Sequence, residues 1–184
     1  MRRRLVVVTL VVALAGLLAE APALAAPKPR FYRGTTSQGM KIQFDLVKKR
    51  SGTLLFRGFS IGADLTCPDA STQSFGLGLE SFPGDPLTGH DLAYDQVDSQ
   101  MGIHVTGSFH SDAASGTFVL NQATLTADEQ AQLCTTGPLT WTAHRTAKSG
   151  TGGLIAGYKV RGRVHVHRLP DGAVARWAKL RRQA

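Results

Sequence analysis

The sequence predicts an all-β domain, built as an antiparallel β-sandwich or a jelly roll with one short helix. Apolar and polar residues alternate along short segments, which is the pattern of strands with one buried face. Turn residues such as Gly, Pro and Asp separate these segments, and about eight strands can be placed in this way. An α/β arrangement needs helices that alternate with the strands. Within the predicted domain a single stretch has the sequence pattern of a helix start, so this arrangement is disfavoured.

The predicted strands follow one another with short turns between them. In the second strand, Ile42, Phe44 and Leu46 alternate with polar residues. The third strand is long, and its apolar face changes at Gly58, which predicts a β-bulge. A tight turn is expected over 112–116. The strands are expected at residues 30–35, 40–46, 54–65, 75–79, 103–109, 117–120, 139–143 and 160–167.

The one helix expected inside the domain rests on a capping box. Thr126 is followed three residues later by Glu129, and in a capping box these two side chains satisfy backbone N–H groups at a helix start. We expect this helix to run to about Cys134. Gly137 and Pro138 then end it before the final strand of the domain.

The formal net charge of +8 is unevenly distributed along the chain. The last 38 residues carry nine Lys or Arg and one Asp, whereas the predicted domain is slightly acidic. An anionic partner would therefore be bound by the C-terminal part. The predicted organisation is a signal peptide over 1–25, a β-sandwich domain over 27–146, a Gly-rich linker over 147–157 and a basic C-terminal tail over 158–184.

The N-terminus has the three parts of a secretory signal. Arg2, Arg3 and Arg4 precede an apolar run over 5–18, and Ala23 and Ala25 form a small-residue cleavage site. The apolar run is too short to span a bilayer, and no later segment is a transmembrane candidate. We therefore expect a secreted protein, either extracellular or associated with the cell wall.

Two cysteines, Cys67 and Cys134, lie within the predicted domain. In an oxidising compartment an even number of cysteines in one domain indicates a disulfide, although two buried thiols that never meet are the alternative. Metal binding by these two sulfurs is disfavoured, because no further Cys or His completes a tetrahedral set nearby.

The basic tail is the strongest functional signal in the sequence. After the linker we expect a strand with a basic face, a turn at 169–172, and a short helix over 173–182 that carries Trp177 at its centre. Such a tail suits an anionic cell-envelope polymer or a lipid surface, and nucleic acid is disfavoured for an exported protein. The alternative is a solvated tail, or one that folds back on the domain. The candidate residues are Arg161, Arg163, Arg168, Arg176, Trp177, Lys179 and Arg182.

An acidic stretch over 81–100 contains no Lys or Arg. Clustered carboxylates can hold Ca²⁺, although the spacing of a dedicated calcium loop is absent. A solvated loop in which the Asp side chains cap turns is the favoured interpretation, and the same loop could receive the basic tail by charge attraction. No other cofactor is expected. The candidate metal ligands are Asp85, Asp91, Asp95 and Asp98.

Three functions compete on these observations. The favoured one is a non-enzymatic extracellular or cell-envelope binding module that is held near an anionic surface by its tail. The second is a small secreted polysaccharide hydrolase that uses Glu80 and a loop Asp as acid and base, although no catalytic residue can be assigned. The third is a structural domain stabilised by calcium.

Several short motifs resemble those of small secreted bacterial proteins without an assigned activity, which are commonest in high-GC Gram-positive genomes. The resemblance covers about residues 30–145 and implies export and an all-β fold. It supplies no active-site residues and does not extend to the basic tail. The motifs are Phe31-Tyr32-Arg33-Gly34-Thr35, Ile42-Gln43-Phe44, Ser115-Gly116-Thr117-Phe118, Cys134-Thr135-Thr136-Gly137 and Leu139-Thr140-Trp141-Thr142-Ala143.

Overall fold

The computed structural model describes residues 29–49, 54–80, 87–125, 131–147 and 163–180. All regular structure within these ranges is β-strand, which confirms the all-β prediction. The predicted signal peptide, most of the predicted linker, and the candidate residues Asp85, Arg161 and Arg182 lie outside the described residues.

The strands form one antiparallel sheet with the order β11-β12-β4-β3-β2-β1-β10-β8-β7-β6-β5, and β9 pairs with both β3 and β8. The strands are β1 (Pro29–Thr36), β2 (Lys41–Lys48), β3 (Leu54–Thr66), β4 (Thr72–Glu80), β5 (Leu87–Thr88), β6 (Asp91–Val97), β7 (Met101–Phe109), β8 (Ala113–Leu125), β9 (Ala131–Thr135), β10 (Leu139–Thr146), β11 (His165–Arg168) and β12 (Val174–Lys179).

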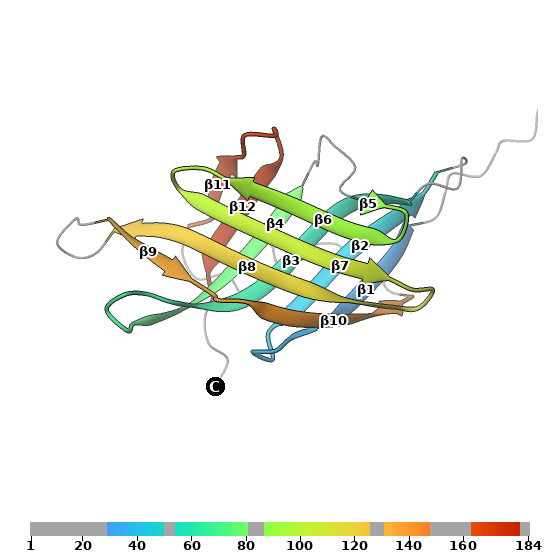
Figure 1. The fold of residues 1–184 in the computed structure, drawn as a ribbon, viewed down its shortest axis with the longest axis horizontal. Helices are drawn as coiled ribbons and strands as arrows, with labels where there is room; N and C mark the ends of the chain where they lie inside the picture. The colour runs from blue at the N-terminus through green and yellow to red at the C-terminus, as the bar shows by residue number, and fades with distance from the viewer. Residues whose placement is uncertain (1–28, 50–53, 81–86, 126–130, 148–162, 181–184) are drawn as a thin grey trace, which may run out of the picture.

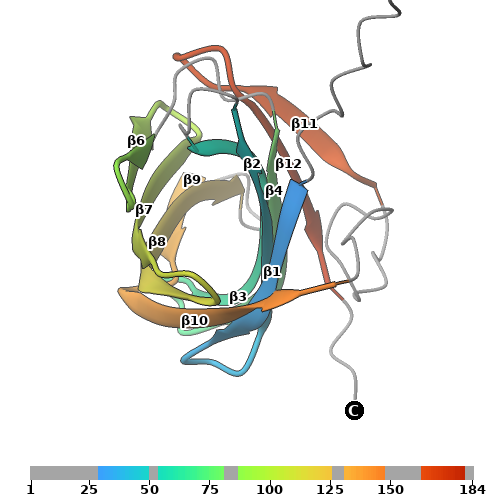
Figure 2. The same cartoon turned by 90° about the vertical axis from the view of Figure 1, so that its right-hand side faces the viewer.

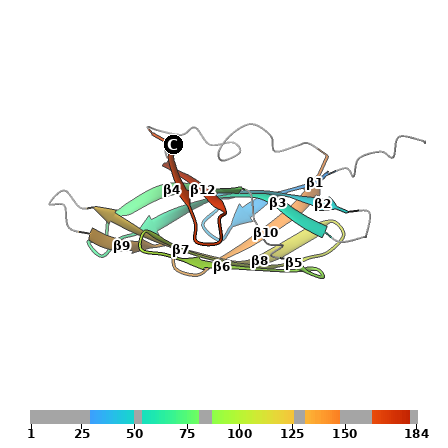
Figure 3. The same ribbon diagram turned by 90° about the horizontal axis from the view of Figure 1, so that it is seen from above.

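Two consecutive runs of neighbouring strands make up most of the sheet. β1 to β4 follow one another in one run and β5 to β8 in the other, and β10 pairs with β1 and β8 and so joins the two. The sheet folds over so that β6, β7 and β8 lie across β1 to β4 as a second layer (Figure 1; Figure 3). Viewed from the end, the two layers enclose the core (Figure 2). The jelly-roll alternative is wrong for the described strands, because a jelly roll needs Greek-key crossings between the sheets.

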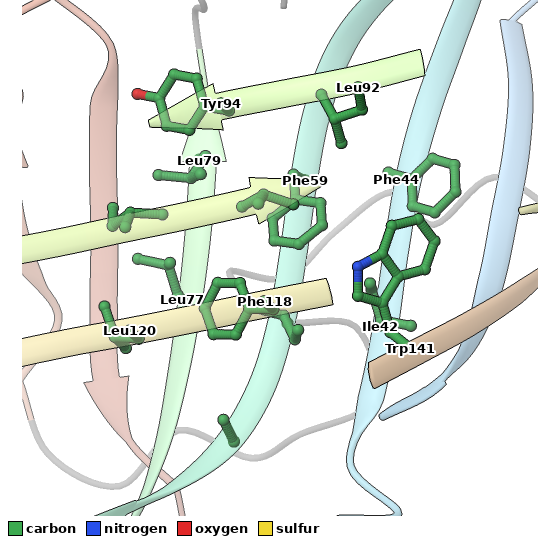
Figure 4. Packing of buried hydrophobic residues seen from close by; sticks show 14 of the residues in the cluster. Ile42, Phe44, Phe59, Leu77, Leu79, Leu92, Tyr94, Phe118, Leu120 and Trp141 are labelled. Atoms are coloured by element: carbon green, nitrogen blue, oxygen red, sulfur yellow. The ribbon is translucent and has the colours of Figure 1, made fainter. Parts of the chain in front are cut away.

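Aromatic side chains from both layers meet in the core. Phe44 of β2 stacks on Tyr32 of β1 at a centroid distance of 4.9 Å and meets Trp141 of β10 edge-on at 5.7 Å. Across the layers, Phe59 of β3 lies 6.1 Å from Phe118 of β8 (Figure 4). These large, fully or almost fully buried rings supply much of the hydrophobic stabilisation of the fold.

Two glycines make room for the indole ring of Trp141. Gly107 and Gly116 are register partners on β7 and β8, and Gly116 is also the partner of Trp141 on β10. A Cβ atom added to either glycine would lie 2.6 Å from Cζ2 of Trp141. The indole Nε1 donates a hydrogen bond to the carbonyl oxygen of Thr117 at 3.1 Å, so the buried ring has its polar atom satisfied.

The predicted disulfide between Cys67 and Cys134 is present, and both residues are buried. Cys67 directly follows β3, and Cys134 lies in β9, which pairs with β8 along its whole length and touches β3 at Thr66 and Thr135. β9 and the disulfide therefore tie the two layers together at one end of the core.

Some predicted details of the elements are confirmed, and others are wrong. The bulge at Gly58 is confirmed, because the pairing of β2 with β3 shifts register there. The tight turn expected over 112–116 ends earlier, since β8 begins at Ala113. The acidic stretch contains a strand in place of a continuous loop, because Leu92 and Tyr94 alternate with polar residues and are buried in the core.

The helix expected from Thr126 to about Cys134 is wrong in its described part. Residues Ala131–Thr135 are extended and form β9. A helix of this length gains little in water, whereas β9 gains ladder hydrogen bonds to β8 and the covalent link to Cys67. The capping-box residues 126–129 lie outside the described residues.

The helix expected over 173–182 is also wrong in its described part, because Val174–Lys179 form β12. β12 pairs with β4 over six residues, and β11 pairs with β12 as a hairpin. An isolated ten-residue helix is marginal, while β4 otherwise presents an unpaired edge to which a strand can bind. The described part of the predicted tail is thus a component of the main sheet.

Candidate functional site

The C-terminal hairpin, defined as β11, β12 and the turn between them, is anchored by buried apolar side chains. Leu169 and Ala173 in the turn and Ala175 on β12 belong to the hydrophobic core. After β12, the backbone N–H of Leu180 donates to the carbonyl oxygen of Ser74 at 2.9 Å, which extends the attachment to β4. The hairpin stands beside β4 at the edge of the sheet (Figure 2). It is therefore a firmly positioned element.

A polar contact attaches the hairpin to the second layer as well. Nε2 of His167 on β11 lies 2.7 Å from Oδ2 of Asp98, which directly follows β6, and both side chains are largely buried. The other carboxylate oxygen of Asp98 accepts hydrogen bonds from the backbone N–H groups of Gln100 and Met101. This one carboxylate both shapes the turn between β6 and β7 and holds the hairpin.

The environment of Asp98 favours its charged form. Partial burial works to raise the pKa of this carboxyl, but the hydrogen bonds from His167, Gln100 and Met101 and the charge of His167 outweigh burial and lower the pKa below its ordinary value. The contact is therefore an ionised carboxylate that accepts hydrogen bonds. An attraction between the acidic stretch and the basic tail was expected from the sequence, and the described structure contains this contact.

The turn of the hairpin contributes a second interaction with β6. Asp171 accepts a hydrogen bond from the backbone N–H of Ala173 at 2.8 Å, which stabilises the turn. Burial raises the pKa of Tyr94 on β6, and the negative charge of Asp171 raises it further. Tyr94 therefore stays neutral at physiological pH. As a result, the carboxylate of Asp171 faces a neutral phenol group and is not repelled by a second negative charge.

Trp177 was predicted to face an anionic surface, but its ring is occupied within the fold. It stacks on His165 at a centroid distance of 4.0 Å and lies 5.4 Å from Phe75 of β4. The register explains this position, because Trp177 is paired with the buried Leu77 and so shares the inner face of the sheet. Trp177 therefore anchors the hairpin.

The outer face of the hairpin carries a small patch of cationic and apolar groups, which we call the hairpin face and define as Val166, Arg168 and Arg176. Val166 is the register partner of Arg176, and its side chain is 64% exposed. Arg168 is exposed and has no ion-pair partner among the described residues. Nε of Arg176 lies 3.3 Å from Oε2 of Glu80, but both side chains remain about half exposed. The surface pair is worth little energetically, so Arg176 is available to another anion.

Two of the other predicted cations lie among the described residues. Arg163 is exposed just before β11, and Lys179 is exposed at the end of β12, on the opposite face of that strand from Arg176. The register of β11 with β12 places Arg168 and Arg176 on the same face of the hairpin. The hairpin face therefore presents two arginines side by side.

The three candidate metal ligands that the structure describes, Asp91, Asp95 and Asp98, do not converge. Asp91 and Asp95 lie on the exposed face of β6, where Asp95 pairs with Nδ1 of His104 at 2.9 Å, whereas Asp98 binds His167. In the described part of the chain, no three Asp, Glu, His or Cys side chains come together in a group that could hold a metal ion.

The hydrolase hypothesis required Glu80 and a second carboxylate across a cleft. Glu80 ends β4 beside Arg176, with its side chain about half exposed. The described geometry gives this hypothesis no support.

A cavity near the start of β1 was not predicted from the sequence. It lies beside Arg30, Phe31 and Arg145, with Asp112 on the turn between β7 and β8. No local signal marks these residues, since they become neighbours only when β1 pairs with β10.

Comparison with known proteins finds no matching family model, no matching curated protein and no matching solved structure. The described residues contain no helix that is long and apolar enough to cross a membrane.

Proposed function

We propose that this protein is a non-enzymatic extracellular binding module that attaches to anionic cell-envelope surfaces through its hairpin face. The observation that carries the proposal is the position of Arg168 and Arg176 next to the exposed Val166, on a hairpin that is anchored in the core. Cations that are already positioned lose less conformational entropy on binding than those of a mobile tail.

The distribution of charge supports the same proposal. Residues 147–184 carry nine Lys or Arg against one Asp, and the described cations among them, Arg163, Arg168, Arg176 and Lys179, lie on or beside the hairpin, which is therefore locally basic. An exposed apolar side chain beside two arginines suits a surface that is anionic and partly apolar, such as phospholipid headgroups. The buried disulfide supports an oxidising compartment outside the cytosol.

The test compares charge variants of the full chain. Replacing both Arg168 and Arg176 with Gln removes the cations of the hairpin face, and replacing Lys48 and Lys49 with Gln removes the same charge from exposed positions near β2. Substitution is preferable to truncation at Ala147, because truncation would also uncover the core-facing side of β4.

We expect the protein to sediment with vesicles that contain phosphatidylglycerol, and to do so less as salt is raised, but not with purely zwitterionic vesicles. The R168Q/R176Q variant should bind about thirtyfold more weakly, since two basic residues are removed and each contributes about 1 kcal/mol near an anionic surface. The K48Q/K49Q control should retain most of the binding.

Competition by soluble polyphosphate would show that polymer phosphates are bound as well as lipid headgroups. Equal sedimentation of R168Q/R176Q and K48Q/K49Q would contradict a specific role for the hairpin face. Binding that does not change with salt would contradict the electrostatic basis of the proposal.

A further inference from the structure

The structure contains a cavity that is distinct from the hairpin face. It has a volume of about 450 Å³ and is lined by Pro29, Arg30 and Phe31 of β1, Arg145 and Thr146 of β10, and Asp112 of the turn between β7 and β8. This volume lies within the range of small-molecule sites, about 300–1,000 Å³. In the sheet order β1 is five strands away from β11, so the two features are separate.

Backbone hydrogen bonds hold the walls of the cavity in place. The N–H of Arg145 donates to the carbonyl oxygen of Asp112 at 2.8 Å, which fixes the turn between β7 and β8 against β10. The register of β1 with β10 places Phe31 opposite Thr146 and Tyr32 opposite Arg145. Since β1 and β10 both belong to the central sheet, the cavity is supported by regular structure on two sides.

The charged groups around the cavity leave an excess of positive charge. Arg30 has no ion-pair partner among the described residues. Nη1 of Arg145 lies 3.8 Å from Oδ1 of Asp112, and both side chains are substantially exposed. A solvated pair at this distance is weak, so the Arg145 guanidinium can turn to another carboxylate at little cost. The lining therefore contains two guanidinium groups and one carboxylate, which is loosely paired with Arg145.

The strand register decides which of these side chains can act together. Successive side chains of a strand point to opposite faces of a sheet. The pairing of Tyr32 with Arg145 puts Arg145 on the same face as Arg30, whereas Phe31 lies on the other face. Because an arginine presents a planar fork that matches a carboxylate, the two arginines together offer a site for a carboxylate group.

We infer that this cavity binds a small organic anion, namely a carboxylate. Arg30 and Arg145 bind the carboxylate, and Asp112 competes with the ligand for Arg145. The inference does not depend on the proposed function of the hairpin face, because it uses none of the same residues.

The test uses benzoate as the probe, with benzyl alcohol as an uncharged probe of similar size, and measures binding to the full chain by calorimetry or by NMR shifts. We expect benzoate to bind, and R30Q and R145Q each to weaken its affinity about tenfold, as the loss of one charge-assisted contact predicts. Because D112N removes the competing carboxylate, it should strengthen binding. The K48Q control removes one positive charge outside the cavity and should leave the affinity unchanged.

Opposite effects of R145Q and D112N cannot arise from a general loss of folding, which would weaken binding in both variants. The inference is overturned if benzoate does not bind, if benzyl alcohol binds equally well, or if K48Q weakens binding as much as R145Q does. Vesicle binding by R30Q and R145Q separates this result from the proposed function, since we expect both variants to sediment like the unmodified protein.

Discussion

At the scale of single residues, the contact between Trp141 and two glycines is a tightly packed part of the core. Gly107 and Gly116 are paired on neighbouring strands, and the indole of Trp141 lies over both. Interiors of proteins are close-packed, so a ring this large has room only where side chains are missing. The glycines are therefore a requirement of this particular core.

Gly107→Ala should lower the free energy of unfolding by about 1–3 kcal/mol, the usual cost of an extra methyl group in a packed core. The new Cβ would lie 2.6 Å from Cζ2 of Trp141, and a rigid indole cannot move away easily. Gly58→Ala is the matched control, because a Cβ at Gly58 has no heavy atom within 4 Å. Urea denaturation measures both, and similar stabilities for the two variants would contradict this account.

At the scale of elements, the C-terminal hairpin departs most from the prediction. It contributes two strands to the sheet and contacts the second layer through His167 and Asp98. Leu169, Ala173 and Ala175 of the hairpin are buried. The hairpin thus contributes to the stability of the domain as well as to its proposed binding surface.

Asp98→Asn should lower the free energy of unfolding by about 1 kcal/mol near neutral pH, because it removes a charged hydrogen-bond acceptor. The folded-state pKa of Asp98 lies below its ordinary value of 3.8, so its contribution is complete above that pH and is lost as the pH falls through the folded-state pKa. Denaturation of both proteins at several pH values measures the difference between them.

That difference should shrink as the pH is lowered from about 4 towards the acid limit, where the carboxylate is protonated in both states. Asp91→Asn serves as a control, since Asp91 is exposed and begins β6, at the opposite end of that strand from Asp98. A constant difference across this pH range would show that the charge of Asp98 does not stabilise the fold.

At the scale of the whole molecule, the disulfide limits how far the two layers can separate. It joins residues 67 positions apart in sequence, at the end of the core where β9 bridges β3 and β8. In the chain-entropy account, closing a loop of this length stabilises the folded state by about 4 kcal/mol. Without the disulfide, the two runs of strands would still be joined by β10, which pairs with both β1 and β8.

Replacing both Cys67 and Cys134 with Ala should therefore lower the free energy of unfolding by up to about 4 kcal/mol, with the sheet retained. The midpoint of urea denaturation and the far-ultraviolet circular dichroism spectrum test both parts. A reducing agent should bring the unmodified protein close to the variant and leave the variant unchanged. Equal midpoints with and without reductant in the unmodified protein would contradict a stabilising disulfide.

Much of the fold was predictable because its signals are local. The alternation of Ile42, Phe44 and Leu46 with polar neighbours predicts β2, and Gly58 marks the bulge in β3. The presence of two cysteines in one domain predicted the disulfide. The candidate site was less predictable. Its cations could be identified by residue type, but the stacking of Trp177 on His165 depends on strand pairing between distant segments, which no local pattern specifies.

The all-β class and the concentration of positive charge in the C-terminal part were determined by the sequence itself, because each depends on residue type and local order. For the disulfide, the sequence offered one possible pair of cysteines, and the tertiary structure brought the two sulfurs together. The tertiary structure decided that 174–179 form a strand, that β9 bridges the layers and that Arg30 and Arg145 share a cavity. These features arise from pairing between segments distant in sequence. A short segment that is marginal as a helix takes whichever conformation its neighbours stabilise, and here the edge of β4 stabilised a strand.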